Sequence, residues 1–197
     1  MIEARGAAGA AREHIEALAA LATEVARGMG AQVAELAALV EATLRGGGKL
    51  LFCGNGGSAA EAQHLAAEYV VRFARERAPL AALALTTDAS VLTASANDCG
   101  FESVFERQVL ALGRRGDLLI LLSTSGESNN LIRAAEAARS AGVSTAALLA
   151  KGGGRLKDRV DLALVLPTAV TARAQEMHLA VGHVVCDLVE RSFMEGA

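Results

Sequence analysis

The sequence lacks the features that mark several common classes of protein. It has no cluster of lysine or arginine, and its 19 basic and 22 acidic residues leave a formal net charge of -3. Such a composition provides no electrostatic attraction for DNA or RNA, so we expect no nucleic-acid partner. No apolar run approaches the roughly 18 residues that a membrane-spanning helix needs, so we expect no membrane partner either.

Cysteine is also scarce and has no regular spacing. The three cysteines, Cys53, Cys99 and Cys186, lie far apart without a CxxC pair. This spacing fits neither a disulfide framework nor a zinc ribbon. The N-terminal residues mix charged side chains with alanines and therefore lack the apolar core of a signal peptide. These absences together predict a cytoplasmic protein.

The apolar residues are numerous enough to form a full core. Of 197 residues, 52% are hydrophobic, and a domain typically has roughly 100 to 200 residues, so we predict a single domain over 1–197. At its start, apolar residues recur at spacings of three and four, from Ile15 to Val25 and again from Val33 to Leu44. This periodicity predicts two amphipathic helices over about 10–45. Gly28 and Gly30 lie between them, so we expect a helical hairpin.

From about residue 48 to 197 the pattern changes to short apolar runs that alternate with helical stretches. The runs predict buried strands at 50–53, 80–85, 118–122, 146–149 and 162–166. The helical stretches are 59–75, 101–112, 129–141 and a last one from Thr171 past Glu190. Alternation of this kind predicts an α/β fold with a doubly wound, mostly parallel five-stranded sheet flanked by helices.

Two turns rich in serine and glycine each follow a predicted strand and open a predicted helix. They are GNGGS at Gly54 to Ser58 and STSGES at Ser123 to Ser128. Ligands bind at the carboxyl ends of such strands, where helix N-termini attract anions, so both turns are candidate phosphate cradles. A tight turn without a ligand and a simple N-cap serine cluster are the alternatives. No GK[ST] follows, which excludes a Walker A loop, and no acidic residue ends the next strand, which disfavours nicotinamide binding.

Two helices carry titratable side chains at suggestive spacings. Glu61, His64, Glu68 and Arg72 recur at three and four, which aligns them on one helix face. The face is either an acid-base or metal site or a solvated charged stripe. On the last helix, His178 and His183 diverge by roughly 140°, so only one is expected to be functional. Sequence spacing does not choose between them.

Four blocks together resemble one family of proteins. They are CGNGGSAAEAQHLAAEYV, ALTTDASVLTASANDCGFESVFERQV, LSTSGESNNLI and TARAQEMHLAVGH. In this order they are similar to the sugar isomerase (SIS) domain family and, within it, to the sedoheptulose 7-phosphate isomerases, or phosphoheptose isomerases. The resemblance runs from about Arg12 to Arg191. It implies a homotetramer that converts sedoheptulose 7-phosphate to D-glycero-D-manno-heptose 7-phosphate, for heptose in bacterial surface polysaccharides such as lipopolysaccharide.

The resemblance also implies roles for individual residues. Its substrate contacts fall on Asn55, Gly56, Gly57, Glu68, Asn97, Asp98, Ser123, Thr124, Ser125, Ser128 and Gln175, to which we add Ser58 and Arg72. It assigns Glu68 as the base and His183 as the acid of an enediol mechanism. Some members bind zinc, and the matching ligands are His64, Glu68, Gln175 and His183. Ala172 stands where some members have an aspartate.

The separation of two of these ligands leaves several arrangements open. Gln175 and His183 are eight residues apart, which is a rise of about 12 Å on one helix. Either the side chains lean together, or Gln175 lies at the helix start, or neighbouring subunits share the site. We favour a site at a subunit interface.

Other functions are compatible with the same blocks. The family includes a non-catalytic tetrameric scaffold that binds the bacterial replication initiator, and isomerases or sensors of other sugar phosphates. A scaffold has no chemical need for Glu68 and His183. Their joint presence therefore favours the enzyme.

Overall fold

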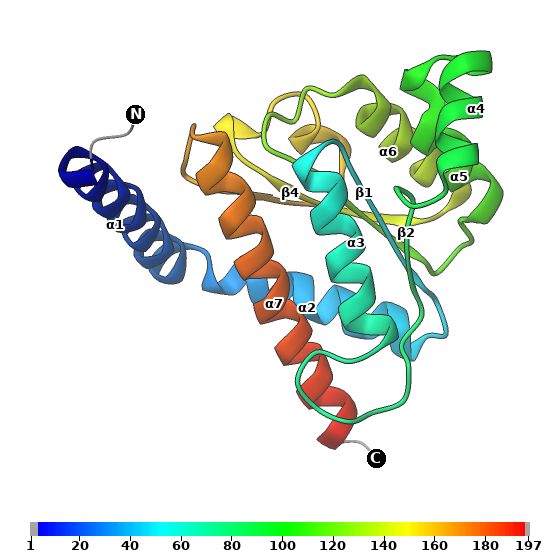
Figure 1. Cartoon of the computed structure of the whole chain (residues 1–197). Helices are drawn as coiled ribbons and strands as arrows, with labels where there is room; N and C mark the ends of the chain where they lie inside the picture. Colours follow the sequence, from blue (N-terminus) through cyan, green and yellow to red (C-terminus); the bar gives the residue numbers. More distant parts are fainter. Residues whose placement is uncertain (1–3, 196–197) are drawn as a thin grey trace.

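A five-stranded parallel sheet forms the centre of the computed structural model, which describes residues 4–195 (Figure 1). Its strand order is β2-β1-β3-β4-β5. The strands are β1 (Leu50–Gly54), β2 (Ala82–Ala84), β3 (Leu118–Ser123), β4 (Ser144–Leu149) and β5 (Leu162–Val165). The chain passes from β1 outward to β2 and then returns to β3 on the other side of β1. This reversal creates a switch point at the carboxyl ends of β1 and β3, where ligands bind in such folds. The predicted sheet is confirmed.

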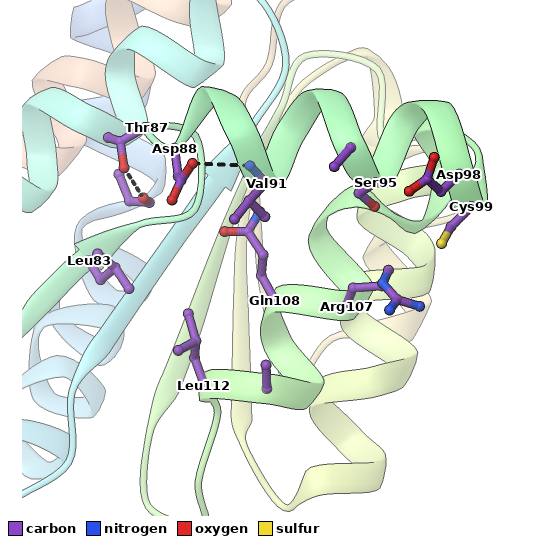
Figure 2. Close-up of a pocket in the computed structure, with 13 residues that line it drawn as sticks. Leu83, Thr87, Asp88, Val91, Ser95, Asp98, Cys99, Arg107, Gln108 and Leu112 are labelled. Atoms are coloured by element: carbon purple, nitrogen blue, oxygen red, sulfur yellow. Dashed lines mark hydrogen bonds between the residues drawn. The ribbon is translucent and has the colours of Figure 1, made fainter.

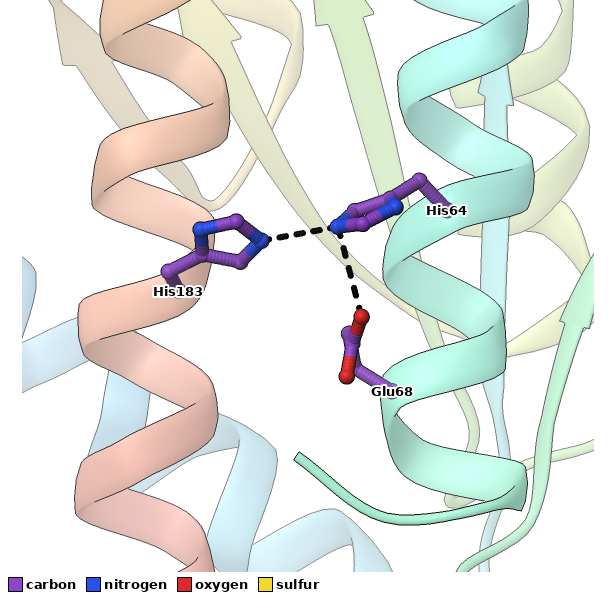
Figure 3. Close-up of side chains that lie close together, drawn as sticks. All are labelled: His64, Glu68 and His183. Atoms are coloured by element: carbon purple, nitrogen blue, oxygen red, sulfur yellow. Dashed lines mark hydrogen bonds and ion pairs between the residues drawn. The ribbon is translucent and has the colours of Figure 1, made fainter. Parts of the chain in front are cut away.

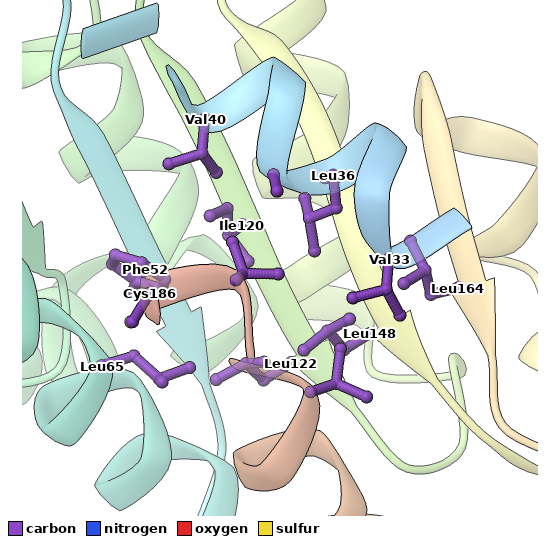
Figure 4. Close-up of a cluster of buried hydrophobic side chains, with 14 of the residues drawn as sticks. Val33, Leu36, Val40, Phe52, Leu65, Ile120, Leu122, Leu148, Leu164 and Cys186 are labelled. Atoms are coloured by element: carbon purple, nitrogen blue, oxygen red, sulfur yellow. The ribbon is translucent and has the colours of Figure 1, made fainter. Parts of the chain in front are cut away.

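Helices cover both faces of the sheet because successive strand side chains point to opposite faces. Leu50 and Phe52 of β1 pack with α2 (Gly30–Arg45), α3 (Gly57–Val70) and α7 (Thr171–Glu195) in one apolar cluster, part of which Figure 4 shows. Leu51 and Cys53 pack on the opposite face with α5 (Val104–Leu112) and α6 (Asn129–Ala141). Each continuous apolar run of the sequence thus serves two cores. Short 3₁₀ turns complete the chain at 101–103, 151–153 and 157–159.

The expected N-terminal hairpin is wrong, although its two helices are present. Helix α1 (Ala4–Gly28) is followed by α2 after a single residue, Met29. Met29 accepts a hydrogen bond from the Val33 N–H and donates its own N–H to the Val25 carbonyl, so the helical bonding pattern continues across the junction. The chain bends here but does not reverse. In Figure 1, α1 consequently projects away from the sheet rather than folding back on α2.

Two further helix predictions need correction. The helix expected over 59–75 begins at Gly57 and ends at Val70. It ends early because the backbone N–H groups of Phe73, Ala74 and Arg75 bond to the carboxylate of Glu190 instead of continuing the helix. Helix α4 (Ala89–Cys99) was not predicted, since only Ser95 of its residues is buried. Within residues 4–195, no helix is both long and apolar enough to cross a membrane.

Candidate active site

A polar cavity of about 190 Å³ lies where the two serine-glycine turns meet. Helices α3, α6 and α7 all begin at this cavity, so three positive helix ends face it. Predicted contact residues that line it are Asn55, Ser58, Ser123, Thr124, Ser125, Ser128 and Gln175. The Ser123 hydroxyl also accepts a hydrogen bond from the Gly126 N–H at 3.0 Å, which shapes the second turn. Hydroxyls and helix ends at one cavity form a site for an anion such as a phosphate monoester.

Close backbone packing accounts for the glycines of the first turn. Gly56 has a φ of +57°, a conformation that favours glycine. A Cβ at Gly57 would overlap the carboxamide of Gln175, so glycine lets α7 approach the start of α3. The side chains of Asn55 and Asn130 exchange two amide hydrogen bonds of 2.9 and 2.8 Å. This pair joins the two turns and fixes the width of the cavity between them.

A second group of side chains lies further along α3 and α7. His64 Nε2 is 2.8 Å from His183 Nε2 and 3.3 Å from a carboxylate oxygen of Glu68 (Figure 3). Ligand atoms of all three residues lie within 4.8 Å of one another. Glu68 and His183, predicted from distant parts of the sequence, therefore meet within one chain. Two imidazole nitrogens and one carboxylate oxygen form a donor set that zinc accepts.

The surroundings of His183 favour its neutral form. Burial lowers the pKa of the imidazole, His64 lowers it further, and the Glu68 carboxylate only partly opposes the shift. The ring of Phe73 lies against it, with 5.3 Å between the ring centroids. A neutral imidazole beside a carboxylate can donate its N–H to a substrate oxygen while the carboxylate accepts a proton from carbon.

Gln175 lies with the cavity rather than beside these three side chains. Its carboxamide packs against Gly57, seven residues or about 10 Å of helix before His64. Gln175 is the fifth residue of α7, so one continuous helix carries it and His183. The cavity and the His64, Glu68 and His183 cluster thus lie at two levels along the same pair of helices, α3 and α7.

Three predicted substrate contacts lie elsewhere in the chain. Asn97 and Asp98 lie near the end of α4, where the Asn97 amide bonds to the Asp98 carboxylate at 2.7 Å. Asp98 lines a separate cavity of about 650 Å³, bounded by β2, α4 and α5 (Figure 2). Arg72 follows the end of α3, and its side chain forms an exposed ion pair with Glu76 at 3.2 Å.

The titratable side chains that were expected on one face of α3 lie in different environments. Glu61 is only 8% exposed, whereas the His64 side chain is 45% exposed. On α7, His178 is completely buried, and burial lowers its pKa to about 4 even though the Leu149 backbone opposes this shift. His178 is therefore the core histidine of the pair, and His183 is the one in the cluster.

Sequence reasoning missed several contributors to the site. Asn130 completes the amide pair, Thr171 lines the cavity and Phe73 packs on His183. Asn130 is next to the STSGES turn, so its position at a helix start was a usable signal. Phe73 gave no such signal, because its contact with His183 depends on the path of the non-helical segment that follows α3.

Comparisons with known proteins agree with this geometry. The SIS domain family model matches residues 13–150. A phosphoheptose isomerase from Rhodospirillum rubrum is 56% identical over 158 residues, which cover 80% of this chain and 84% of the relative.

Solved structures show the same similarity. A phosphoheptose isomerase from Neisseria gonorrhoeae aligns with a TM-score of 0.88 and 40% identity, covering 93% of this chain and 98% of that one. One from Francisella tularensis has a TM-score of 0.91 and 34% identity, covering 94% and 98%.

Proposed function

Because the chain belongs to the SIS domain family, we propose that it is a phosphoheptose isomerase, which converts sedoheptulose 7-phosphate to D-glycero-D-manno-heptose 7-phosphate. The single observation that carries this proposal is the pair of groups that α3 and α7 bring together. An anion cavity lies at the starts of these helices, and a carboxylate with an imidazole lies further along them. An isomerase of sugar phosphates needs both parts. The product is the precursor of heptose in bacterial surface polysaccharides.

The phosphate binds in the cavity at the starts of α3, α6 and α7. Ser123, Thr124, Ser125 and Ser128 supply hydroxyls from one side, and Asn55 and Ser58 supply polar groups from the other. Hydrogen bonds to a charged group contribute about 1.5 to 3 kcal/mol each, so several of them hold a phosphate without a lysine. Gly56 and Gly57 bring backbone N–H groups within reach, and Gln175 binds the sugar hydroxyls.

Proton transfer takes place at the His64, Glu68 and His183 cluster. Glu68 removes a proton from C1 of the open-chain ketose while the neutral imidazole of His183 donates its N–H to the oxygen on C2. The resulting enediol then loses the proton of its C1 hydroxyl and gains one at C2, which yields the aldose. The short separation of Glu68 and His183 supports this division of roles.

The same three side chains form the proposed zinc site. His64, Glu68 and His183 fit zinc by their donor chemistry, whereas the expected fourth ligand, Gln175, packs against Gly57 at the cavity and does not join them. When bound, zinc supplies Lewis-acid polarisation of the substrate oxygens. Glu68→Gln should weaken zinc binding measured by chelator competition, whereas Glu136→Gln, an exposed carboxylate of α6, should not. Equal affinities in the two variants would remove Glu68 from the site.

We also propose a homotetramer with shared sites and one SIS domain per chain. Exposed apolar side chains, among them Ile15 of α1 and Val184 and Leu188 of α7, support contact with other subunits. An apolar groove of about 330 Å³ between α1, α2 and α7 adds to this surface. Asn97, Asp98 and Arg72, remote from the cavity of their own chain, then reach the site of a neighbour. The free cysteines support a reducing, cytoplasmic environment.

Turnover of sedoheptulose 7-phosphate tests the reaction directly. Purified protein is incubated with the ketose, with and without chelator, and the aldose is detected by its C1 proton in NMR spectra. Glu68→Gln should lower kcat by a factor of about 100 or more, since general-base catalysis typically contributes 10² to 10⁴. Glu136→Gln is the matched control. No turnover by the unaltered protein under either condition would refute the proposed reaction.

A further inference from the structure

The segment that follows α3 is held against α7 by one buried carboxylate. Glu190 is 1% exposed, and its oxygens accept hydrogen bonds from the N–H groups of Phe73, Ala74 and Arg75 at 3.0, 2.9 and 2.8 Å. Burial by itself raises the pKa of Glu190, but these donors and Arg77 outweigh it and bring the pKa below its ordinary value. Glu190 is therefore an anion inside the fold. Figure 1 shows the segment after α3 passing beside the C-terminal half of α7.

Arg77 connects this carboxylate to the last turn of α3. The Arg77 side chain is 5% exposed, and its Nε lies 3.3 Å from Glu190. Its terminal nitrogens donate to the carbonyl oxygens of Glu68 and Tyr69 at 2.7 and 2.8 Å. These carbonyls belong to the end of a helix, where backbone acceptors lack helical partners. The turn that carries Glu68 is consequently fixed by the ion pair.

Phe73 connects the same carboxylate to His183. Its backbone N–H bonds to Glu190, while its ring lies 5.3 Å from the His183 ring at an interplanar angle of 33°. Glu190 is seven residues after His183, two turns further along the same face of α7. One residue thus holds the backbone beside both members of the proton-transfer pair.

We propose that Glu190 is a positioning residue, which fixes Glu68 through Arg77 and fixes His183 through Phe73. This inference rests on the proposed function, because it assigns Glu190 to the geometry of that reaction. Glu190 itself touches neither the anion cavity nor the His64, Glu68 and His183 cluster in the contacts of the described residues.

The first test separates substrate binding from proton transfer. Glu190→Gln keeps the shape but removes the charge and half of the acceptor capacity. We expect kcat to fall by about 10- to 100-fold, as for other outer partners of a catalytic group, while KM stays within about twofold. Asp187→Asn is the control on the same helix, because it breaks the ion pair with Arg75 and leaves the bonds of Glu190 intact. A folded Glu190→Gln protein with unchanged kcat would overturn the proposal.

A second variant covers the case in which Glu190→Gln does not fold. Phe73→Leu retains the backbone N–H that bonds to Glu190 but removes the aromatic face from His183. It should lower kcat without changing KM, and any loss of thermal stability should be small because Phe73 is only partly buried against the apolar cluster. Wild-type kcat in this variant would contradict the part of the proposal that concerns His183.

A spectroscopic measurement is independent of the reaction. The aromatic ring of Phe73 lies against His183 and should therefore change the NMR chemical shifts of the His183 ring protons. Comparison of the unaltered protein with Phe73→Leu measures the size of that change. The shift should disappear in Glu190→Gln and persist in Asp187→Asn. If the unaltered protein fails to turn over the ketose, the proposed function is wrong. The NMR measurement would still show whether Glu190 fixes the position of Phe73 against His183. Persistence of the shift in folded Glu190→Gln would refute it.

Discussion

At the scale of single residues, burial changes the charge of a side chain that sequence alone would place in solvent. Glu61 precedes His64 and Glu68 in the same helical repeat, yet it is 8% exposed and one of its oxygens has no partner among the described residues. Burial raises its pKa from 4.5 to about 7, although Ser58 opposes the shift. The carboxyl group next to the anion cavity is therefore largely protonated below neutral pH.

Glu61 should make the protein less stable as the pH rises. Between pH 4.5 and about 7 the unfolded chain releases this proton while the folded protein retains it, so the free energy of unfolding decreases across that interval. Glu61→Gln lacks this loss. Its free energy of unfolding relative to wild type should rise by up to about 3 kcal/mol from pH 4.5 to pH 8, as measured by urea denaturation. Glu136→Gln, which removes an exposed carboxylate, is the control, and a parallel pH course in both variants would contradict the prediction.

Gly57 should affect substrate binding more than stability. In Gly57→Ala the new methyl group displaces the Gln175 carboxamide from its position beside the cavity. Loss of one hydrogen bond of about 1.5 kcal/mol raises KM for the sugar phosphate about tenfold. Steady-state kinetics measure this change. Gly28→Ala, where nothing lies within 4 Å of the added Cβ, should leave KM unchanged.

At the scale of elements, the helices and strands that were predicted most accurately are those that depend on a local sequence pattern. The strands and α6 follow from short apolar runs and turn residues, and their bounds agree closely with the structure. Helix α4 escaped prediction because only one of its residues, Ser95, is buried, although Asp88 caps it by accepting from the Val91 N–H. The early end of α3 and the bend at Met29 depend on tertiary contacts, which periodicity does not contain.

The packing of α3 on α7 depends on a glycine. A Cβ at Gly182 would lie 2.5 Å from a methyl carbon of Leu65, so the two helices are in direct contact one residue before His183. Gly182→Val should reduce the free energy of unfolding by about 1 to 3 kcal/mol through overpacking. Leu65→Ala alone should reduce the free energy of unfolding by about 2 to 5 kcal/mol. The double variant should lose less than the sum of the two separate reductions, because the smaller side chain at 65 leaves room for the larger one at 182. Urea denaturation of the four proteins tests this, and strict additivity would argue against the contact.

At the scale of the whole molecule, one chain explains only part of the candidate site. The serine-glycine turns could be predicted from their residue types and their places after strands, whereas the choice of Glu68 and His183 came from resemblance, and the structure places those two side chains together. The roles expected for Asn97 and Asp98 came from resemblance, and their positions on α4 remain apart from the cavity of the same chain. The proposed assembly of chains would bring them to the cavity of a neighbouring subunit.

Mixed assemblies of two inactive variants test the proposed shared site. Glu68→Gln and Asp98→Asn proteins should each be inactive, and refolding them together should restore part of the activity if Asp98 serves a neighbouring chain. A mixture of Glu68→Gln and His183→Ala proteins should restore no activity. Glu68 and His183 belong to the cluster of one chain, so every cluster in the mixture lacks one of them. The absence of restored activity in the first mixture would assign Asp98 to its own chain or to no site.

The spacing between the anion cavity and the His64, Glu68 and His183 cluster bears on which sugars the proposed isomerase accepts. From Gly57 at the anion cavity to His64 in the cluster, α3 advances seven residues, or about 10 Å. An ester anchored at the cavity must extend that far before its carbonyl carbon meets Glu68. We therefore expect a seven-carbon ketose phosphate to react faster than a five-carbon one, which comparison of kcat/KM for the two substrates tests.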